Sequence, residues 1–423
     1  MDDVLSHLRS DHLAGRRRGL VSICSAHPDV LAAAMHAALR GPGALLVEAT
    51  ANQVNQHGGY TGLTPETYMA GLRRLAAVAG FPPERLAVGA DHLGPWAWRT
   101  EPAETAMRRC EELIQRCVRS GFRKLHIDTG FGCADDPAPL VSLRHAVERA
   151  VRLCRAAEAA VAPGDPLPFY VVGAEVPVPG GDLSGSGPPA VTTVAELESA
   201  LGQFHAGFRA AGLESAWERV VAVVVQPGVE FGDDGVAVYR PERAAALSRF
   251  HERLPGVMVY EVHSADYQPA DALARMTADH FTLLKVGPCL THALRLAVAA
   301  LESVEGELLG GRPGTGRSGV SAALEAAMLA DPTHWRAHYR GSAEEQRRLR
   351  RDSLRDRARY YWGAPGVPAA LERLHRNLAG PLPRRLVERH FPDLELPDDA
   401  VDAAAIVRAC VQAALRPYLD ATS

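Results

Sequence analysis

An acid–imidazole pair at one predicted strand end and a histidine at another could together hold a divalent metal ion. Asp91 and His92 end the short apolar run RLAVGAD, which a Gly-Pro turn then terminates, and His263 ends the run VMVYEVH. Asp128 ends a third run of this kind. Apolar runs of this length between turn-forming residues are typical of buried strands. Because α/β enzymes place their chemistry at the carboxyl ends of parallel strands, we expect these side chains to converge.

Histidines from separate strands suit Zn²⁺ or a similar divalent ion, with a carboxylate or an amide as a third ligand. We expect His92 and His263 to bind the same ion. Zinc is the first choice of cofactor, and Ni, Co, Mn and Mg are the alternatives. An ion with an open coordination position would act as a Lewis acid on a carbonyl group. Asp91 would either support the neighbouring histidine or move a proton nearby.

The same plan recurs in eight apolar segments, separated by stretches with helical spacing. The segments span 20–26, 44–50, 85–91, 124–128, 169–176, 219–226, 257–263 and 281–287. Eight strands that alternate with helices indicate an α/β fold with a closed (β/α)₈ TIM barrel. An open doubly wound sheet is the alternative, but no GxGxxG follows any strand, which disfavours a dinucleotide-binding version.

Polar side chains mark the carboxyl end of each predicted strand. Buried charges cost several kcal/mol unless they are paired or ligated. A converging ring of them therefore indicates a binding site, although some members could pair as salt bridges at the barrel mouth. The members of the ring are Ser25, His27, Glu48, Asp91, His92, Asp128, Glu175, Gln226, Glu261, His263 and Lys285.

We divide the chain into a barrel, residues 1–305, and a mainly helical C-terminal extension, residues 306–423, that packs on it. The glycine-rich segment 310–319 has no strand before it and no GK[ST] at its end, so we interpret it as a connection rather than a P-loop. The Gly- and Pro-rich segment 176–190 is a candidate lid over the barrel mouth.

Two further segments carry side chains that suit a sugar phosphate. The loop 51–62 is rich in amides and glycine, and its Asn52 and Gln53 could hydrogen-bond to a polyol. The arginine-dense segment 344–362 is either a solvated helix face or a source of arginines that fold over the mouth and neutralise phosphate.

Composition limits the classes of partner and the compartment. The net charge of −4 leaves no electrostatic footprint for nucleic acid, and no basic tract or long apolar run points to a membrane. The N-terminus is too polar for a signal peptide. Seven scattered cysteines without a CxxC pair indicate reduced thiols, and we expect a cytoplasmic protein.

Several blocks of the sequence strongly resemble one protein family. They are SICSAHPDV, LLVEATANQVNQHGGYTG, GADHLGP, GAEVPVPGG, VVQPGVEF, YEVHSADYQ and LKVGPCLTHALR. On these blocks the chain is identified as a member of the family named for the non-catalytic subunit of class II tagatose-1,6-bisphosphate aldolase. That family is similar in turn to the class II aldolases, which are metal-dependent (β/α)₈ barrels that cleave ketose phosphates.

The resemblance implies roles for individual site residues. Asp91 and His92 match the proton-transfer aspartate and the first metal-binding histidine of the aldolases. His263 matches another metal-binding histidine, and Glu175 matches a glutamate of the fifth strand, a further catalytic candidate. Gln226 stands where the aldolases have another ligand histidine, so Glu175 or Gln226 is expected to complete the coordination.

The resemblance also implies contacts with the substrate. The KVGP block occupies the place of the last βα loop of the aldolases, which is a phosphate site in such barrels. We therefore expect backbone amides there to bind phosphate, together with an arginine of the C-terminal segment. The expected substrate-binding residues are Glu48, Asn52, Gln53, Ser264, Lys285, Gly287 and Arg357.

Membership of this family implies two candidate functions. Some members are accessory subunits that stabilise a catalytic aldolase, whereas others are metal-dependent epimerases that interconvert tagatose and fructose, usually as the 6-phosphates. An accessory protein has no need for a ring of ligand-type residues, so this ring favours an enzyme. We therefore expect an isomerase, a tagatose-6-phosphate 4-epimerase, with the accessory aldolase subunit as the alternative.

The chemistry of a C4-epimerase narrows its mechanism. The C4 proton of a 2-ketose is not α to the carbonyl, so we expect retro-aldol cleavage and re-addition, with Asp91 and Asp128 as proton carriers. The expected partners are a ketose or ketose phosphate, an aldolase catalytic subunit and further copies of the same chain, but neither nucleic acid nor a membrane.

Overall fold

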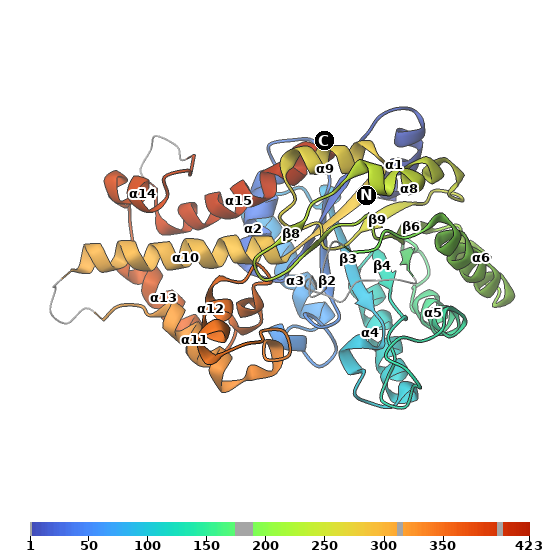
Figure 1. The fold of residues 1–423 in the computed structure, drawn as a ribbon, viewed down its shortest axis with the longest axis horizontal. Helices are drawn as coiled ribbons and strands as arrows, with labels where there is room; N and C mark the ends of the chain where they lie inside the picture. Colours follow the sequence, from blue (N-terminus) through green and yellow to red (C-terminus); the bar gives the residue numbers. More distant parts are fainter. Residues whose placement is uncertain (1, 174–188, 311–315, 396–400) are drawn as a thin grey trace.

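The computed structural model describes residues 2–173, 189–310, 316–395 and 401–423, and a closed barrel of eight parallel strands lies at its centre (Figure 1). The order of hydrogen-bonded neighbours around the barrel is β1-β10-β9-β6-β5-β4-β3-β2. Each strand overlaps its predicted segment, so the predicted TIM barrel is confirmed. The strands are β1 (Leu20–Cys24), β2 (Leu45–Thr50), β3 (Leu86–Leu93), β4 (Lys124–Ile127), β5 (Phe169–Val172), β6 (Val220–Val224), β9 (Val259–Val262) and β10 (Phe281–Val286).

Helices between the strands surround the barrel, and local sequence signals set their ends. Thr64 caps the helix that begins at Pro65, where a proline loses no helical hydrogen bond, and Gly80 ends it with a φ of +65°. A short hairpin of β7 (Glu230–Phe231) and β8 (Val236–Ala237) follows β6. The helices up to β10, apart from the first, are α2 (Pro28–Ala38), α3 (Pro65–Ala79), α4 (Ala103–Ser120), α5 (Leu143–Glu158), α6 (Val194–Ala210), α7 (Glu214–Trp217), α8 (Pro241–Phe250) and α9 (Ala270–Ala278).

The inside of the barrel is apolar toward the amino ends of the strands, and a layer of polar and charged side chains follows toward their carboxyl ends. Alternate residues of a strand face the same side, so positions two apart share the barrel interior. The apolar layer includes Leu20, Leu46 and Leu283. Two residues further along these three strands lie Ser22, Glu48 and Lys285, which are buried and linked through Glu48 by short polar contacts.

The first helix, α1 (Asp2–Leu13), closes the apolar end of the barrel, which the sequence analysis did not predict. Leu5 and Leu8 of α1 belong to the same buried apolar cluster as the strand residues of that layer. Arg9 fixes the helix by donating hydrogen bonds to the backbone oxygens of His251 and Met258, at 3.1 and 3.3 Å. The polar layer therefore has its opening at the opposite end, at the carboxyl ends of the strands.

The chain after β10 is helical, as expected, and it gathers on one side of the barrel (Figure 1). The expected boundary between residues 305 and 306 falls inside α10, so one helix joins the barrel to this part. The last helix, α15, returns to pack against α2, α9 and α10. The helices are α10 (Pro288–Leu309), α11 (Val320–Ala330), α12 (Ala343–Asp352), α13 (Val367–Asn377), α14 (Arg384–His390) and α15 (Ala403–Thr422).

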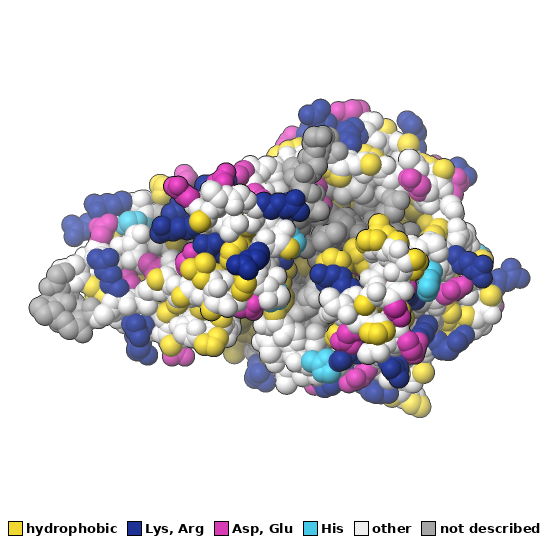
Figure 2. Space-filling model, turned by 60° about the horizontal axis from the view of Figure 1, so that its bottom comes forward, with side chains coloured by type: hydrophobic (Ala, Val, Ile, Leu, Met, Phe, Trp, Pro, Cys, Tyr) yellow, Lys and Arg dark blue, Asp and Glu magenta, His cyan; other side chains and the backbone are white. Residues whose placement is uncertain are grey.

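The outer surface carries charges of both signs. Figure 2 shows basic and acidic side chains interspersed over the visible face, in keeping with the net charge of −4. None of the described helices is long and apolar enough to cross a membrane. The candidate lid at 176–190 lies almost wholly outside the described residues, as does the middle of the connection 310–319.

Candidate metal centre and ligand cavity

Four buried side chains bring possible metal ligands together at the carboxyl end of the barrel. Asp91, His126, Glu261 and His263 each offer one ligand atom, and these atoms all lie within 4.8 Å of one another. The structure thus brings Asp91 and His263 together. Two imidazole nitrogens and two carboxylate oxygens form a donor set of the kind that Zn²⁺ binds.

His126 is the member of this group that the sequence analysis did not single out. It lies on β4 between Lys124 and Asp128, and all three positions face the barrel interior because they are two residues apart. Its Nδ1 atom lies 2.7 Å from Asp91 Oδ1. Its Nε2 atom is buried and has no hydrogen-bond partner among the described residues. The alternating run Lys-His-Asp was the signal that could have revealed it.

Two lysines neutralise part of the charge beneath this group. Lys124 Nζ lies 2.7 Å from Glu48 Oε1 and 2.6 Å from Glu261 Oε2. Lys285 Nζ contacts Asp91 Oδ1 and lies 3.4 Å from both Glu48 and Glu261. Burial opposes the charged form of Lys285, but the surrounding carboxylates raise its pKa well above the usual value. Both lysines are therefore charged at neutral pH.

The balance of buried charge favours a divalent cation. Burial opposes ionisation of Asp91 and Glu261, but nearby cations hold both pKa values well below the usual range, with His92 acting on Asp91 and Lys124 on Glu261. The four buried carboxyl groups of Glu48, Asp91, Asp128 and Glu261 outnumber the two ammonium groups of Lys124 and Lys285. A divalent ion bound by Asp91 and Glu261 would offset negative charge that is buried there, so the residues present fit such an ion.

The imidazole of His263 is prepared for metal binding. Burial and the positive charge of Lys285 lower its pKa to about 3, so the ring is neutral at physiological pH. A neutral imidazole is the form that binds a metal. Its Nε2 atom lies 3.0 Å from Glu261 Oε1.

His92 lies in the same cluster, but carboxylates contact both of its nitrogens. Its ring centroid is 5.1 Å from that of His263. Its Nδ1 atom lies 2.9 Å from Asp128 Oδ2, and its Nε2 atom lies 3.5 Å from Asp91 Oδ2. Burial favours the neutral ring, but Asp91 and then Asp128 raise the pKa of His92. The residue adopts a φ of +49°, a strained conformation that concentrates at functional sites.

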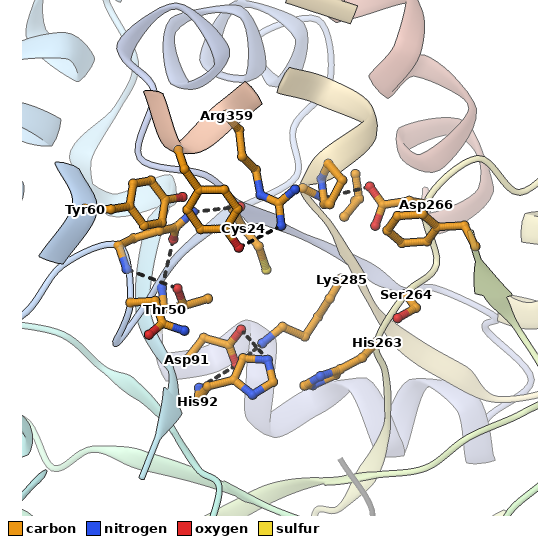
Figure 3. A pocket seen from close by; sticks show the side chains of 17 residues that line it. Cys24, Thr50, Tyr60, Asp91, His92, His263, Ser264, Asp266, Lys285 and Arg359 are labelled. Carbon is orange, nitrogen blue, oxygen red and sulfur yellow. Dashed lines mark hydrogen bonds and ion pairs between the residues drawn. The ribbon is translucent and has the colours of Figure 1, made fainter. Parts of the chain in front are cut away.

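A cavity opens above the cluster, and Figure 3 shows Asp91, His92, His263 and Lys285 pointing toward one another at its floor. Of the expected substrate-binding residues, Asn52, Gln53, Ser264, Lys285 and Gly287 line this cavity. Glu48 lies beneath the cavity rather than on it, because its carboxylate is held by Ser22 and the two lysines.

Two expected site residues are placed differently from the prediction. The side-chain oxygen of Gln226 accepts hydrogen bonds from the amides of Gly228 and Val229, at 2.7 and 2.9 Å, so it serves its own loop. The Nε atom of Arg357 donates to the backbone oxygen of His334, and this side chain does not line the cavity. In this structure neither side chain therefore lies where the prediction placed it, and Glu175 lies outside the described residues.

Arg359 takes the place that was expected for Arg357. It belongs to the short helical turn Arg357–Tyr361 and lines the cavity beside Tyr60 (Figure 3). Its guanidinium donates to the backbone oxygen of Asp356 at 3.1 Å and to the hydroxyl of Tyr360 at 3.0 Å. The C-terminal part of the chain thus supplies a cation to the cavity. This agrees with the interpretation in which an arginine of segment 344–362 folds over the barrel mouth.

Comparisons with known proteins agree with the resemblance seen in the sequence. The model of the family described as D-tagatose-1,6-bisphosphate aldolase subunit GatZ/KbaZ-like matches residues 5–423. The D-tagatose-1,6-bisphosphate aldolase subunit GatZ of Klebsiella pneumoniae is 41% identical over 99% of this chain and 98% of its own length. The GatZ subunit of Salmonella dublin is 43% identical over 92% of this chain and 91% of its own length.

A solved structure shares the fold over nearly the whole chain. It is described as a probable tagatose 6 phosphate kinase from Sinorhizobium meliloti, with 40% identity and a TM-score of 0.85, and the match covers 96% of this chain and 100% of that one. The expectation of an isomerase is wrong, because the curated relatives are named as subunits of an aldolase. The chain belongs to the GatZ/KbaZ-like family of D-tagatose-1,6-bisphosphate aldolase subunits.

Proposed function

We propose that this chain is an accessory subunit that binds and stabilises the catalytic subunit of a class II tagatose-1,6-bisphosphate aldolase. The observation that carries the proposal is the match over nearly full length to relatives named as subunits of that aldolase. Seven free cysteines support a cytoplasmic location, where thiols stay reduced.

We propose further that the buried cluster holds one divalent ion, with zinc as the first choice. His126 and His263 would supply nitrogen ligands, and Asp91 and Glu261 would supply oxygen ligands. Bound there, the ion would supply a Lewis acid facing the cavity. For an accessory subunit the ion also has a structural consequence, since it would offset negative charge that is buried at the barrel mouth.

The cavity above the cluster supports a small polar ligand of the ketose or ketose phosphate class. Asn52, Gln53 and Ser264 line it with groups able to exchange hydrogen bonds with hydroxyls, and Arg359 adds a positive charge. The side-chain oxygen of Gln53 already accepts from the amide of Thr50 at 2.9 Å, which fixes the orientation of this side chain.

The test is to mix the purified chain with a catalytic subunit of a class II tagatose-1,6-bisphosphate aldolase. We expect a complex in size-exclusion chromatography with light scattering, and a longer half-life of aldolase activity on warming than with an equal mass of an unrelated protein. The chain alone is expected to leave tagatose 1,6-bisphosphate intact. Neither a complex nor a longer half-life, or cleavage of the bisphosphate by the chain alone, would contradict the proposal.

A further inference from the structure

The amino-terminal end of α10 is already occupied by a side chain of the protein. Asp266 Oδ1 accepts hydrogen bonds from the amides of Gly287 and Cys289, at 3.0 and 2.8 Å. The helix has 22 residues and follows the last barrel strand. In a (β/α)₈ barrel this is a place where a ligand phosphate binds, because free amides and the helix dipole both favour an anion. Here the carboxylate of Asp266 already accepts hydrogen bonds from those amides.

Two segments of the C-terminal part hold the loop that carries this carboxylate in place. Asp266 is 2% exposed and lies in the loop after β9, where Ser264 and Tyr267 have φ values of +56° and +61°. The hydroxyl of Tyr418, from α15, donates to the backbone oxygen of Ala265 at 3.1 Å. The hydroxyl of Tyr267 donates to the backbone oxygen of Leu354 at 2.6 Å. The loop is therefore tied to two separate segments of the C-terminal part.

The amides that Asp266 engages are equally fixed. A Cβ atom added to Gly287 would lie 2.7 Å from the backbone oxygen of Cys24, so only glycine allows this approach of β10 to β1. Asp266 and Gly287 both line the cavity. A ligand phosphate at this end would meet a buried negative charge instead of free amides, and repulsion between like charges is strong where water is excluded.

The cavity offers an anion a different contact. Arg359 lines it, and in the described part of the chain no carboxylate forms an ion pair with its guanidinium. The cavity thus receives its positive charge from Arg359 of the C-terminal part and its carboxylate from Asp266 in the loop after β9. A carboxylate accepts hydrogen bonds from hydroxyl groups, so the end at Asp266 suits an uncharged polyol terminus.

We propose that Asp266 is a specificity-determining residue that keeps ligand phosphate away from the amino-terminal end of α10 and directs an anionic group to Arg359. The inference rests on the proposed function in one respect. An accessory subunit that cannot bind phosphate at the amino-terminal end of α10 would not compete with its catalytic partner for the bisphosphate. It concerns the binding of phosphate by this chain alone, so it can fail while the association with an aldolase subunit holds.

The test measures binding of inorganic phosphate by the full chain labelled with ¹⁵N-cysteine, which gives one backbone amide signal for each of the seven cysteines. In the wild type we expect the Cys289 amide signal to stay unchanged up to about 10 mM phosphate. Asp266→Ser removes the carboxylate and should shift this signal, with affinity at least about tenfold above that of the wild type. Asp271→Asn removes one exposed carboxylate from α9 and should behave as the wild type.

The position of the bound anion is checked with Arg359→Gln. This change should weaken any phosphate binding by the wild type, but it should leave the gain in Asp266→Ser in place. A phosphate-induced shift of the Cys289 amide in the wild type would overturn the proposal, and that measurement decides even if Asp266→Ser fails to fold. Phosphate binding no tighter in a folded Asp266→Ser than in the wild type would also overturn it.

Discussion

His126 and Asp91 lie on neighbouring strands, and the Nδ1 atom of His126 is 2.7 Å from the Oδ1 atom of Asp91. The backbone amide of His92 donates to Asp91 Oδ1 at 2.9 Å and also lies 3.4 Å from His126 Nδ1, so the end of β3 contacts both groups. Nε2 is buried without a hydrogen-bond partner in the described part of the chain. His126 thus contributes a buried nitrogen to the same group of possible metal ligands as Asp91.

The first prediction concerns this nitrogen. His126→Ala should lower the affinity for Zn²⁺ by about 100-fold or more, since changes even to residues behind the ligands cost about 10–100-fold. The measurement is isothermal titration of the metal-free chain with zinc, together with the metal content of the purified protein. His145→Ala, at an exposed position of α5, is the control and should bind zinc as the wild type does. Equal affinity in the two variants would remove His126 from the ligand set.

Strand periodicity explains both what the sequence could predict and what it missed at this site. Asp91 and His263 were predictable because each ends an apolar run, and the ends of parallel strands meet at one barrel mouth. His126 was less conspicuous because Asp128, and not His126, is the polar residue that ends its run. Positions two apart share a face, so both point inward, and the inner one joins the ligand group.

Contacts between distant parts of the chain were not predictable in the same way. The carboxylate of Asp266 accepts from the amide of Gly287, Tyr418 of α15 holds the backbone beside it, and Arg359 reaches the cavity from beyond the barrel. No local spacing encodes such neighbours, because they depend on how the C-terminal helices pack. For that reason the sequence did not show that Arg359, rather than Arg357, would line the cavity. The two arginines lie two residues apart on one short helical turn.

The second prediction concerns the buried ion pairs beneath the cavity. Lys124→Met should lower the free energy of unfolding by about 3–5 kcal/mol, because Glu48 and Glu261 would lose a buried partner while staying in place. Urea denaturation followed by far-UV circular dichroism measures the change. Arg144→Met removes a cation from an exposed pair with Glu148 and should change stability by less than about 0.5 kcal/mol. Similar losses in both variants would contradict a buried network.

The third prediction concerns pH and three histidines near α1. The rings of His12, His251 and His280 lie together, with those of His251 and His280 stacked at 4.3 Å. Burial lowers all three pKa values, and with the charge of His280 it brings that of His251 to about 3. Each folded pKa lies below the unfolded value, so this stability is complete above about pH 6.5 and falls as the pH drops toward 3.

The contribution of one ring can be isolated by substitution. His251→Phe keeps an aromatic ring against His280 but cannot be protonated. Between pH 7.5 and 5 the wild type should lose roughly 1–2 kcal/mol more unfolding free energy than this variant. His145→Phe changes an exposed histidine and should keep the pH dependence of the wild type. Identical pH profiles for the wild type and His251→Phe would show that this ring is not protonated on unfolding.

The last prediction concerns the close approach of the chain just after β3 to the chain just after β4. A Cβ atom on Gly94 would lie 1.5 Å from the backbone oxygen of Asp128, so Gly94→Ala must push the two strand ends apart. Since Asp128 Oδ2 holds His92 Nδ1 at 2.9 Å, the shift should also free that ring. We expect a loss of at least about 3 kcal/mol, seen as a lower melting temperature. Gly71→Ala, in the middle of α3, meets no atom nearer than 3.8 Å and should be neutral or slightly stabilising. An unchanged melting temperature for Gly94→Ala would mean that β3 and β4 do not approach this closely.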